Sequence, residues 1–170
     1  MKNISSDNWQ ERGTEMSNYT WIDYDIKYAH IVEPWFDDET MYYTGCDEGW
    51  NDYYLDMIND PETILNQNSW VKIIYDGPTP IGIMSLSKDD PGYYIAEFAI
   101  APDKRGKGIG TAVLQDLLHN SQTIIGETIT EANACIFPDN PPSQKAFEKA
   151  GFHFDHAHPD GDAWYYVYKV

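Results

Sequence analysis

A basic, glycine-rich segment at residues 102–111 lies between a predicted strand and the strongest helical pattern of the chain. Glycine allows a backbone to turn tightly and to approach a ligand without a Cβ clash. The unpaired N–H groups at a helix start, together with the helix dipole, favour phosphate. Three of the eleven Lys and Arg residues lie here, at Lys104, Arg105 and Lys107. The segment therefore predicts a strand–loop–helix unit, and it is either a phosphate loop or a tight turn without a ligand.

Two common phosphate loops do not match this segment. A P-loop ends in Gly-Lys-Ser/Thr, whereas Gly110-Thr111 lacks the lysine. A dinucleotide-binding loop needs Gly-x-Gly-x-x-Gly after an early strand of a parallel unit, and the spacing from Gly106 is wrong. The segment at 102–111 is therefore a different kind of phosphate loop, or it binds no phosphate.

The segments before the loop alternate between strands and turns. Strands at 70–75 and 80–87 flank a turn and predict a hairpin, and 93–101 is a third strand that ends at Pro102. The remaining predicted elements are helices at 49–59, 109–118 and 143–150, a strand at 129–137, and a hairpin formed by 152–158 and 163–170. This order predicts one mixed α/β (α+β) domain, which the length of 170 residues also favours.

The charge balance is strongly acidic, with 28 Asp and Glu against 11 Lys and Arg and a net charge of −17. Nucleic acids and anionic membranes are therefore disfavoured as partners, and a cationic partner is favoured. Alternatively, the acidic charge serves only to keep the protein soluble or to adapt it to a salty medium. Residues 28–71 hold no Lys or Arg and interleave acids with aromatic rings. That mixture suits a cation-accepting surface, or else helices that turn rings inward and acids outward.

Targeting and metal signals are weak. Residues 1–18 have no apolar stretch and are expected to be a flexible lead, and no apolar run is long enough for a membrane span. Cys46 and Cys135 fit neither a disulfide framework nor a zinc site, which predicts a reduced, cytoplasmic location. The histidines within 153–158 fall on both faces of a strand, so no metal site is predicted.

Two motifs carry a resemblance to a known family. Arg105-x-x-Gly108-x-Gly110 is similar to the Arg/Gln-x-x-Gly-x-Gly/Ala loop of the GCN5-related N-acetyltransferases (GNAT). The segment at 140–152 resembles that family's Asn-x-x-Ala/Ser-x-x-x-Tyr-Glu-Lys-x-Gly-Phe motif. Residues before 70 match the general family poorly, although the segment at 30–35 resembles His-Ile-Val-Glu-Trp-Trp of aminoglycoside 6'-N-acetyltransferase-like members.

The resemblance implies a fold and an activity. It implies a GNAT domain over 19–170 with a mixed, mostly antiparallel central sheet and helices on both faces. Residues 19–69 are then the acceptor side and 70–170 the acetyl-CoA-binding core. The implied reaction moves an acetyl group from acetyl-CoA to a primary amine of a small cationic acceptor, aminoglycoside- or polyamine-like. Dimers are common in the family, which leaves a homodimer open.

The resemblance also implies site residues. Glu97, the one carboxylate on strand 93–101, is the expected base, with Asp89 and Asp90 as lesser candidates. The N–H near Ile100 is the expected donor to the thioester oxygen. The expected cofactor-binding residues are Ala99, Ile100, Ala101, Arg105, Gly106, Lys107, Gly108, Ile109, Gly110, Thr111, Asn140, Ser143, Lys145 and Phe147. The expected acceptor-binding residues are Glu33, Trp35, Asp37, Asp38 and Glu97.

One position departs from the family pattern. Phe147 stands where the family commonly carries a tyrosine that is proposed to protonate the leaving thiolate. Another group or water must then supply that proton, or no proton is needed. A protein or peptide N-acetyltransferase and a non-catalytic CoA-binding sensor are the alternative functions.

Overall fold

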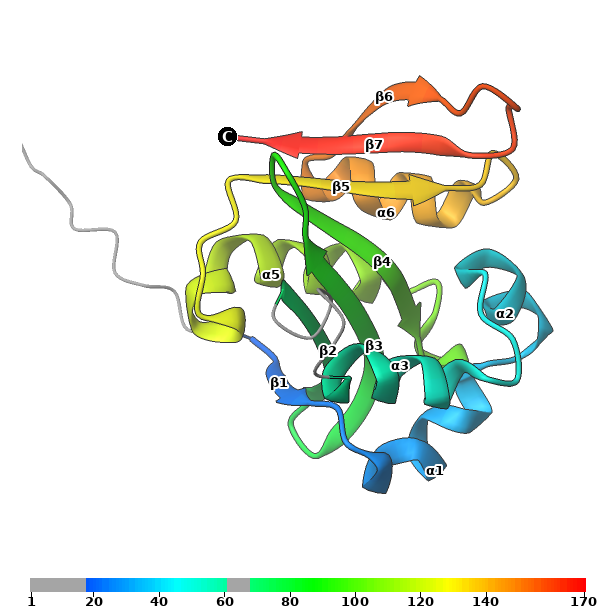
Figure 1. The fold of residues 1–170 in the computed structure, drawn as a ribbon, viewed down its shortest axis with the longest axis vertical. Helices are drawn as coiled ribbons and strands as arrows, with labels where there is room; N and C mark the ends of the chain where they lie inside the picture. The colour runs from blue at the N-terminus through cyan, green and yellow to red at the C-terminus, as the bar shows by residue number, and fades with distance from the viewer. Residues whose placement is uncertain (1–17, 61–67) are drawn as a thin grey trace, which may run out of the picture.

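The seven strands of the computed structural model, which describes residues 18–60 and 68–170, form one sheet in the order β1-β2-β3-β4-β5-β7-β6 (Figure 1). Every neighbouring pair is antiparallel except β4 and β5. The strands are β1 Thr20–Asp23, β2 Ser69–Asp76, β3 Thr79–Lys88, β4 Tyr93–Ile100, β5 Glu131–Ile136, β6 His153–Ala157 and β7 Trp164–Lys169. The mixed, mostly antiparallel sheet is confirmed. The expected lead at 1–18 lies almost wholly outside the described residues.

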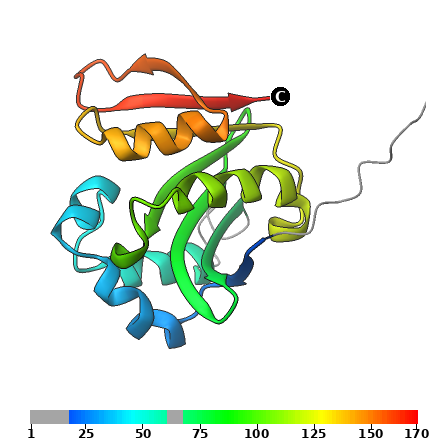
Figure 2. The ribbon, with the colours of Figure 1, turned by 180° about the vertical axis from the view of Figure 1, so that it is seen from behind.

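Helices cover both faces of the sheet. They are α1 Ala29–Val32, α2 Asp38–Thr44, α3 Trp50–Asn59, α5 Ile109–Ile125 and α6 Pro141–Ala150, with 3₁₀ turns at Ile26–Tyr28, Glu33–Trp35 and Pro102–Lys104. The side chains of α5 and α6 belong to one apolar cluster and those of α1 to α3 to the other. Turning the molecule around brings α5 and α6 in front of the sheet (Figure 2).

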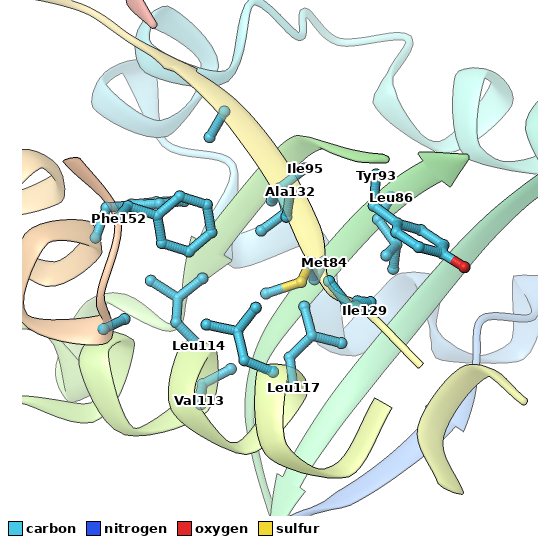
Figure 3. Close-up of a cluster of buried hydrophobic side chains, with 14 of the residues drawn as sticks. Met84, Leu86, Tyr93, Ile95, Val113, Leu114, Leu117, Ile129, Ala132 and Phe152 are labelled. Carbon is cyan, nitrogen blue, oxygen red and sulfur yellow. The ribbon is translucent and has the colours of Figure 1, made fainter. Parts of the chain in front are cut away.

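The first cluster lies between the sheet and the helices α5 and α6. Val113, Leu114 and Leu117 project from α5 toward the strands, with Met84 and Phe152 beside them (Figure 3). Their spacing places them on one face of the helix, and all three α5 side chains are fully buried. This packing fixes the helix that starts at the glycine-rich loop.

The second cluster is formed largely by aromatic rings of the acidic stretch. Phe36 stacks on Trp50 at 4.8 Å between ring centroids, and Tyr54 packs edge-on against both. Trp35 is buried in the same cluster. Most of these rings point into the core, as expected if the acids and rings of this stretch lie on opposite faces of helices. Tyr42 differs, because it is 58% exposed. The acids lie outward because a carboxylate without a partner is costly to bury.

A β-bulge on β4 changes which face its side chains reach. Ser85 of β3 pairs with Glu97, but Leu86 pairs with Ile95, so Ala96 is the extra residue. Residues two apart in a regular strand lie on the same face of the sheet. Because of the bulge, Ile95 instead faces the cluster under α5, whereas Glu97 faces α3. Without the extra residue, Glu97 would point into the first cluster.

Candidate active site

The strands β4 and β5 separate along their length. Their parallel pairing runs from Tyr93 opposite Ala132 to Ile95 opposite Ala134, and β4 then continues to Ile100 along a diverging path (Figure 1). Among the described residues, the second half of β4 is thus paired on the β3 side only, and its other edge faces the gap.

The backbone of Ile100 is directed toward that gap. The N–H of Ala101 donates to the carbonyl of Ile81 at 2.8 Å, on the β3 side. Because successive residues of a strand direct their N–H and C=O groups to opposite edges, those of Ile100 point toward β5. The position predicted for the N–H donor therefore lies at the open edge.

The glycine-rich loop connects this edge to α5. Gly106 and Gly108 have φ of +73° and +78°, which a side chain rarely adopts. Gly108 is the N-cap of α5, and a Cβ built there meets no atom within 4 Å, so the loop is open above it. The N–H groups of Ile109, Gly110 and Thr111 stand in the first turn, where they have no partner within the helix. This is the geometry that receives a phosphate.

On the other face of β4, Glu97 borders a cavity of about 270 Å³. The cavity is lined by Gly45, Cys46, Asp47, Gly49, Trp50, Tyr53 and Glu97. Glu97 is only 8% exposed. The Ser85 hydroxyl donates to its carboxylate, and the Glu97 N–H donates back to the Ser85 oxygen at 3.1 Å. A carboxylate so enclosed, with one side open to a cavity, is suited to exchange a proton with a bound molecule.

The electrostatics of this cavity favour protonated groups. Burial raises the pKa of Glu97, and hydrogen bonds from Ser85 and Tyr53 offset only part of that rise. Burial first, and then the Glu97 charge, raise the pKa of Tyr53 to about 12 and of the Cys46 thiol to about 11. The thiol is therefore no nucleophile at neutral pH. Burial therefore favours the protonated form of Glu97 more than water would.

A sequence model described as the Acetyltransferase (GNAT) family matches residues 28–152. The chain belongs to the GNAT family. The match includes both the glycine-rich loop and the segment that starts at Asn140, so the resemblance drawn from these motifs is confirmed. Acetyl-CoA is the coenzyme of this family, and the open loop and the open edge of β4 fit a diphosphate followed by an extended arm.

Relatives and solved structures agree with this membership. Uncharacterized N-acetyltransferase YfmK of Bacillus subtilis (strain 168) is 30% identical over 99 residues, which span 58% of this chain and 64% of that protein's length. Aminoglycoside acetyltransferase AAC(6')-Ib in complex with coenzyme A has a TM-score of 0.68 at 21% identity, covering 89% of this chain and 94% of that one. Spermidine N-acetyltransferase from Vibrio cholerae in complex with CoA and spermine has a TM-score of 0.68 at 16% identity, covering 89% and 95%. At these identities the two solved structures show a shared GNAT fold.

The second motif of this GNAT chain lies at the start of α6. Asn140 is the N-cap, and its side-chain oxygen accepts from the Ser143 N–H at 3.3 Å. Lys145 is exposed on the same helix. Phe147 is 3% exposed and packs on Phe152 with 5.0 Å between ring centroids. The position of the family's tyrosine is thus a core position in this chain.

The predicted acceptor residues are not brought together. Of the five, only Glu97 lines the cavity. Glu33 and Asp38 are exposed elsewhere, Trp35 is in the core, and Asp37 contacts Arg105 of the glycine-rich loop.

Sequence reasoning missed the cavity residues Cys46, Asp47 and Tyr53, and also Ser85. The acids and rings near the predicted helix at 49–59 were a signal for the first three. Nothing in one sequence pairs Ser85 with a carboxylate twelve positions away.

Within residues 18–60 and 68–170, no three His, Cys, Asp or Glu side chains gather as a metal would need. In the same part of the chain, no helix has the length and apolar character of a membrane span.

Proposed function

We propose that this chain transfers an acetyl group from acetyl-CoA to a primary amine of a small cationic acceptor. One observation carries the proposal. A buried carboxylate, Glu97, borders an acid- and ring-lined cavity on one side of β4, while the open edge of the same strand faces the gap toward β5. The base and the strand edge therefore lie within one short segment.

The coenzyme would bind along three elements of the chain. The first-turn N–H groups of α5 would hold the diphosphate, with Lys107 adding positive charge. The edge of β4 at 98–100 would pair with the extended pantetheine arm as an added strand. Asn140, Ser143 and Lys145 on the β5 side would border that arm. Acetyl-CoA supplies the acetyl group as a thioester.

Two groups of this chain would act on the reacting atoms. Glu97 would accept the proton that the amine must lose before it can attack, directly or through a water molecule. The N–H of Ile100 would donate to the carbonyl oxygen on which negative charge develops. No covalent link to the chain is needed, which agrees with a protonated Cys46 thiol.

The acceptor class follows from the lining of the cavity. Asp47 and Glu97 provide carboxylates and Trp50 and Tyr53 provide ring faces, and both attract ammonium groups. The net charge of −17 concentrates cations near the whole surface. Two solved structures of the same fold hold small molecules with several amines. These are AAC(6')-Ib in complex with coenzyme A and kanamycin, and spermidine N-acetyltransferase from Vibrio cholerae in complex with CoA and spermine.

The test is an assay of CoA thiol release with a panel of aminoglycosides, polyamines and basic peptides. We expect turnover with at least one aminoglycoside or polyamine, and an acetylated product by mass spectrometry. Turnover with peptides alone would overturn the acceptor class. Stabilisation by acetyl-CoA in a thermal shift assay, without turnover of any amine, would instead support a CoA-binding sensor, the function that Phe147 favours.

A further inference from the structure

The guanidinium of Arg105 turns away from the glycine-rich loop and toward α2. Its Nε donates to the carbonyl of Ile100 at 3.1 Å. Its Nη1 lies 3.3 Å from Oδ2 of Asp37 and 3.5 Å from Oε2 of Glu39, and its Nη2 donates to the Thr40 hydroxyl. All three nitrogens are thus engaged by the end of β4 and the start of α2.

Asp37 links this arginine to the helix backbone. It is the N-cap of α2, and its Oδ1 accepts from the Thr40 N–H at 2.8 Å while Oδ2 faces Arg105. Burial acts to raise the pKa of Asp37, but the hydrogen bonds from Thr40 and the Arg105 charge outweigh it and lower the pKa. The carboxylate is therefore charged at neutral pH and remains a partner for the guanidinium.

The other face of α2 is tied to the end of β5. The Tyr43 hydroxyl donates to the carbonyl of Asp139 at 2.9 Å, and the Tyr42 hydroxyl donates to Oδ2 of Asp139 at 3.2 Å. Tyr42 also packs on Phe137, with 5.3 Å between ring centroids. The helix α2 therefore bridges the ends of β4 and β5, and it lies between them in Figures 1 and 2.

The residues that follow α2 form a wall of the Glu97 cavity. α2 ends at Thr44, and Gly45, Cys46 and Asp47 line the cavity directly afterwards. The position of α2 consequently sets the position of that wall relative to Glu97.

We propose that Arg105 is a positioning residue of the acceptor site, which fixes α2 across the end of the β4–β5 gap, and not a side-chain ligand of the diphosphate. A diphosphate would have to compete with two carboxylates for a guanidinium whose donors are already used. The backbone of residue 105 remains part of the loop. The proposal deepens the proposed function, because it assigns to that reaction a residue that controls acceptor binding.

The test compares R105Q and R105K with K104Q, which removes a charge from the neighbouring residue without touching α2. Hydrogen exchange is measured first on the free protein. Loss of a hydrogen-bonded charge pair is expected to speed exchange over 38–46 about tenfold in both Arg105 variants, and not in K104Q. Exchange over 141–150 serves as the internal reference. Unchanged exchange over 38–46 in both variants would overturn the proposal, whatever the acceptor is.

Binding then separates the two roles of Arg105. We expect R105Q and R105K to raise the KM of the cationic acceptor about tenfold, with CoA affinity changed less than about threefold. Since pantetheine lacks the diphosphate, a tenfold loss of CoA affinity in R105Q with pantetheine affinity kept would assign Arg105 to the phosphates and overturn the proposal.

A double variant checks the pairing itself. Asn at position 37 still caps a helix, so D37N removes the Asp37–Arg105 ion pair, keeps the cap and leaves Glu39 in place. R105Q combined with D37N should exchange no faster over 38–46 than R105Q alone. Fully additive effects would contradict the link. The exchange data need no substrate, so absence of turnover in the wild type would refute the proposed function without deciding this point.

Discussion

At the scale of single residues, Glu97 is the proposed base, and its burial would set function against stability. A carboxylate that is 8% exposed loses most of its hydration, and its hydrogen bonds to Ser85 and Tyr53 do not restore its ordinary pKa. Such a cost is accepted at sites where a proton must be moved.

Replacing Glu97 by Gln should separate these two roles. The folded-state pKa lies above the unfolded one, so its protonated form is favoured by folding, and stability falls as pH rises through the folded pKa. E97Q removes that penalty. We expect kcat to fall about 10²–10⁴-fold while the melting temperature at neutral pH is unchanged or higher. Full activity would contradict the role of Glu97; E148Q, on the exposed side of α6, is the matched control and should keep both properties.

The pH dependence of kcat/KM gives a second test at this scale. A base must be deprotonated to act, so activity should be lost as pH falls through the Glu97 pKa. Because burial raises that pKa, the midpoint of the acidic limb should lie above the ordinary carboxyl value of 4.5. The limb should vanish in the residual activity of E97Q. A midpoint at or below 4.5 would show that another group titrates.

At the scale of elements, the loop between β4 and α5 depends on one backbone conformation. Gly108 has φ of +78°, whereas Gly110 lies inside the helix and a Cβ there would be 3.7 Å from the Ala146 Cβ, an ordinary contact. The two glycines of the motif thus differ: Gly108 has the left-handed conformation of an N-cap, whereas Gly110 has room for a Cβ beside α6.

Alanine substitutions should reveal this difference. We expect G108A to cost about 1–2 kcal/mol, since a side chain in the left-handed region is strained. For G110A we expect a neutral or slightly stabilising effect, because alanine favours a helix interior. Thermal unfolding of both variants is the measurement. A loss in G110A as large as that in G108A would show that close packing, and not backbone conformation, requires the glycines.

Most helices and strands could be predicted from the sequence, whereas only part of the candidate site could. The strand at 93–101 and the helix at 143–150 are found as β4 Tyr93–Ile100 and α6 Pro141–Ala150, because alternation and turn residues mark them. The helix at 109–118 continues to Ile125, since Ile124 and Ile125 resume its buried face after a polar interval with non-helical backbone at Asn120.

The bulge at Ala96 and the pairing of Arg105 with α2 have no sequence signal, because each depends on contacts between segments distant in the chain. Glu97 was predictable as the one acid of its strand, whereas its partners were not.

At the scale of the whole molecule, the helices α1 to α3 and the loop before α5 carry opposite charge. Residues 28–60, which include no Lys or Arg, form α1 to α3 over one face, while the basic loop at 102–111 leads into α5 on the other. A cationic acceptor and an anionic coenzyme would thus be attracted to different sides of β4.

Salt should reveal this division. Raising ionic strength from about 0.1 M to 1 M shortens the screening length from about 10 Å to about 3 Å. The KM of an acceptor with three or four amines should then rise severalfold more than the KM of a single-amine acceptor, because the acidic surface no longer concentrates it. Equal changes for both acceptors would show that the net charge of −17 has no part in acceptor binding.

In the proposed reaction one strand, β4, serves the coenzyme at its edge and the acceptor through Glu97. The decisive experiment is a crystal structure of E97Q with CoA and a polyamine or aminoglycoside that the wild type acetylates. We expect the diphosphate on the first-turn N–H groups of α5, the pantetheine arm between β4 and β5, and an amine within hydrogen-bond reach of residue 97. Coenzyme bound elsewhere, or an amine held outside the cavity of Glu97 and Tyr53, would contradict it.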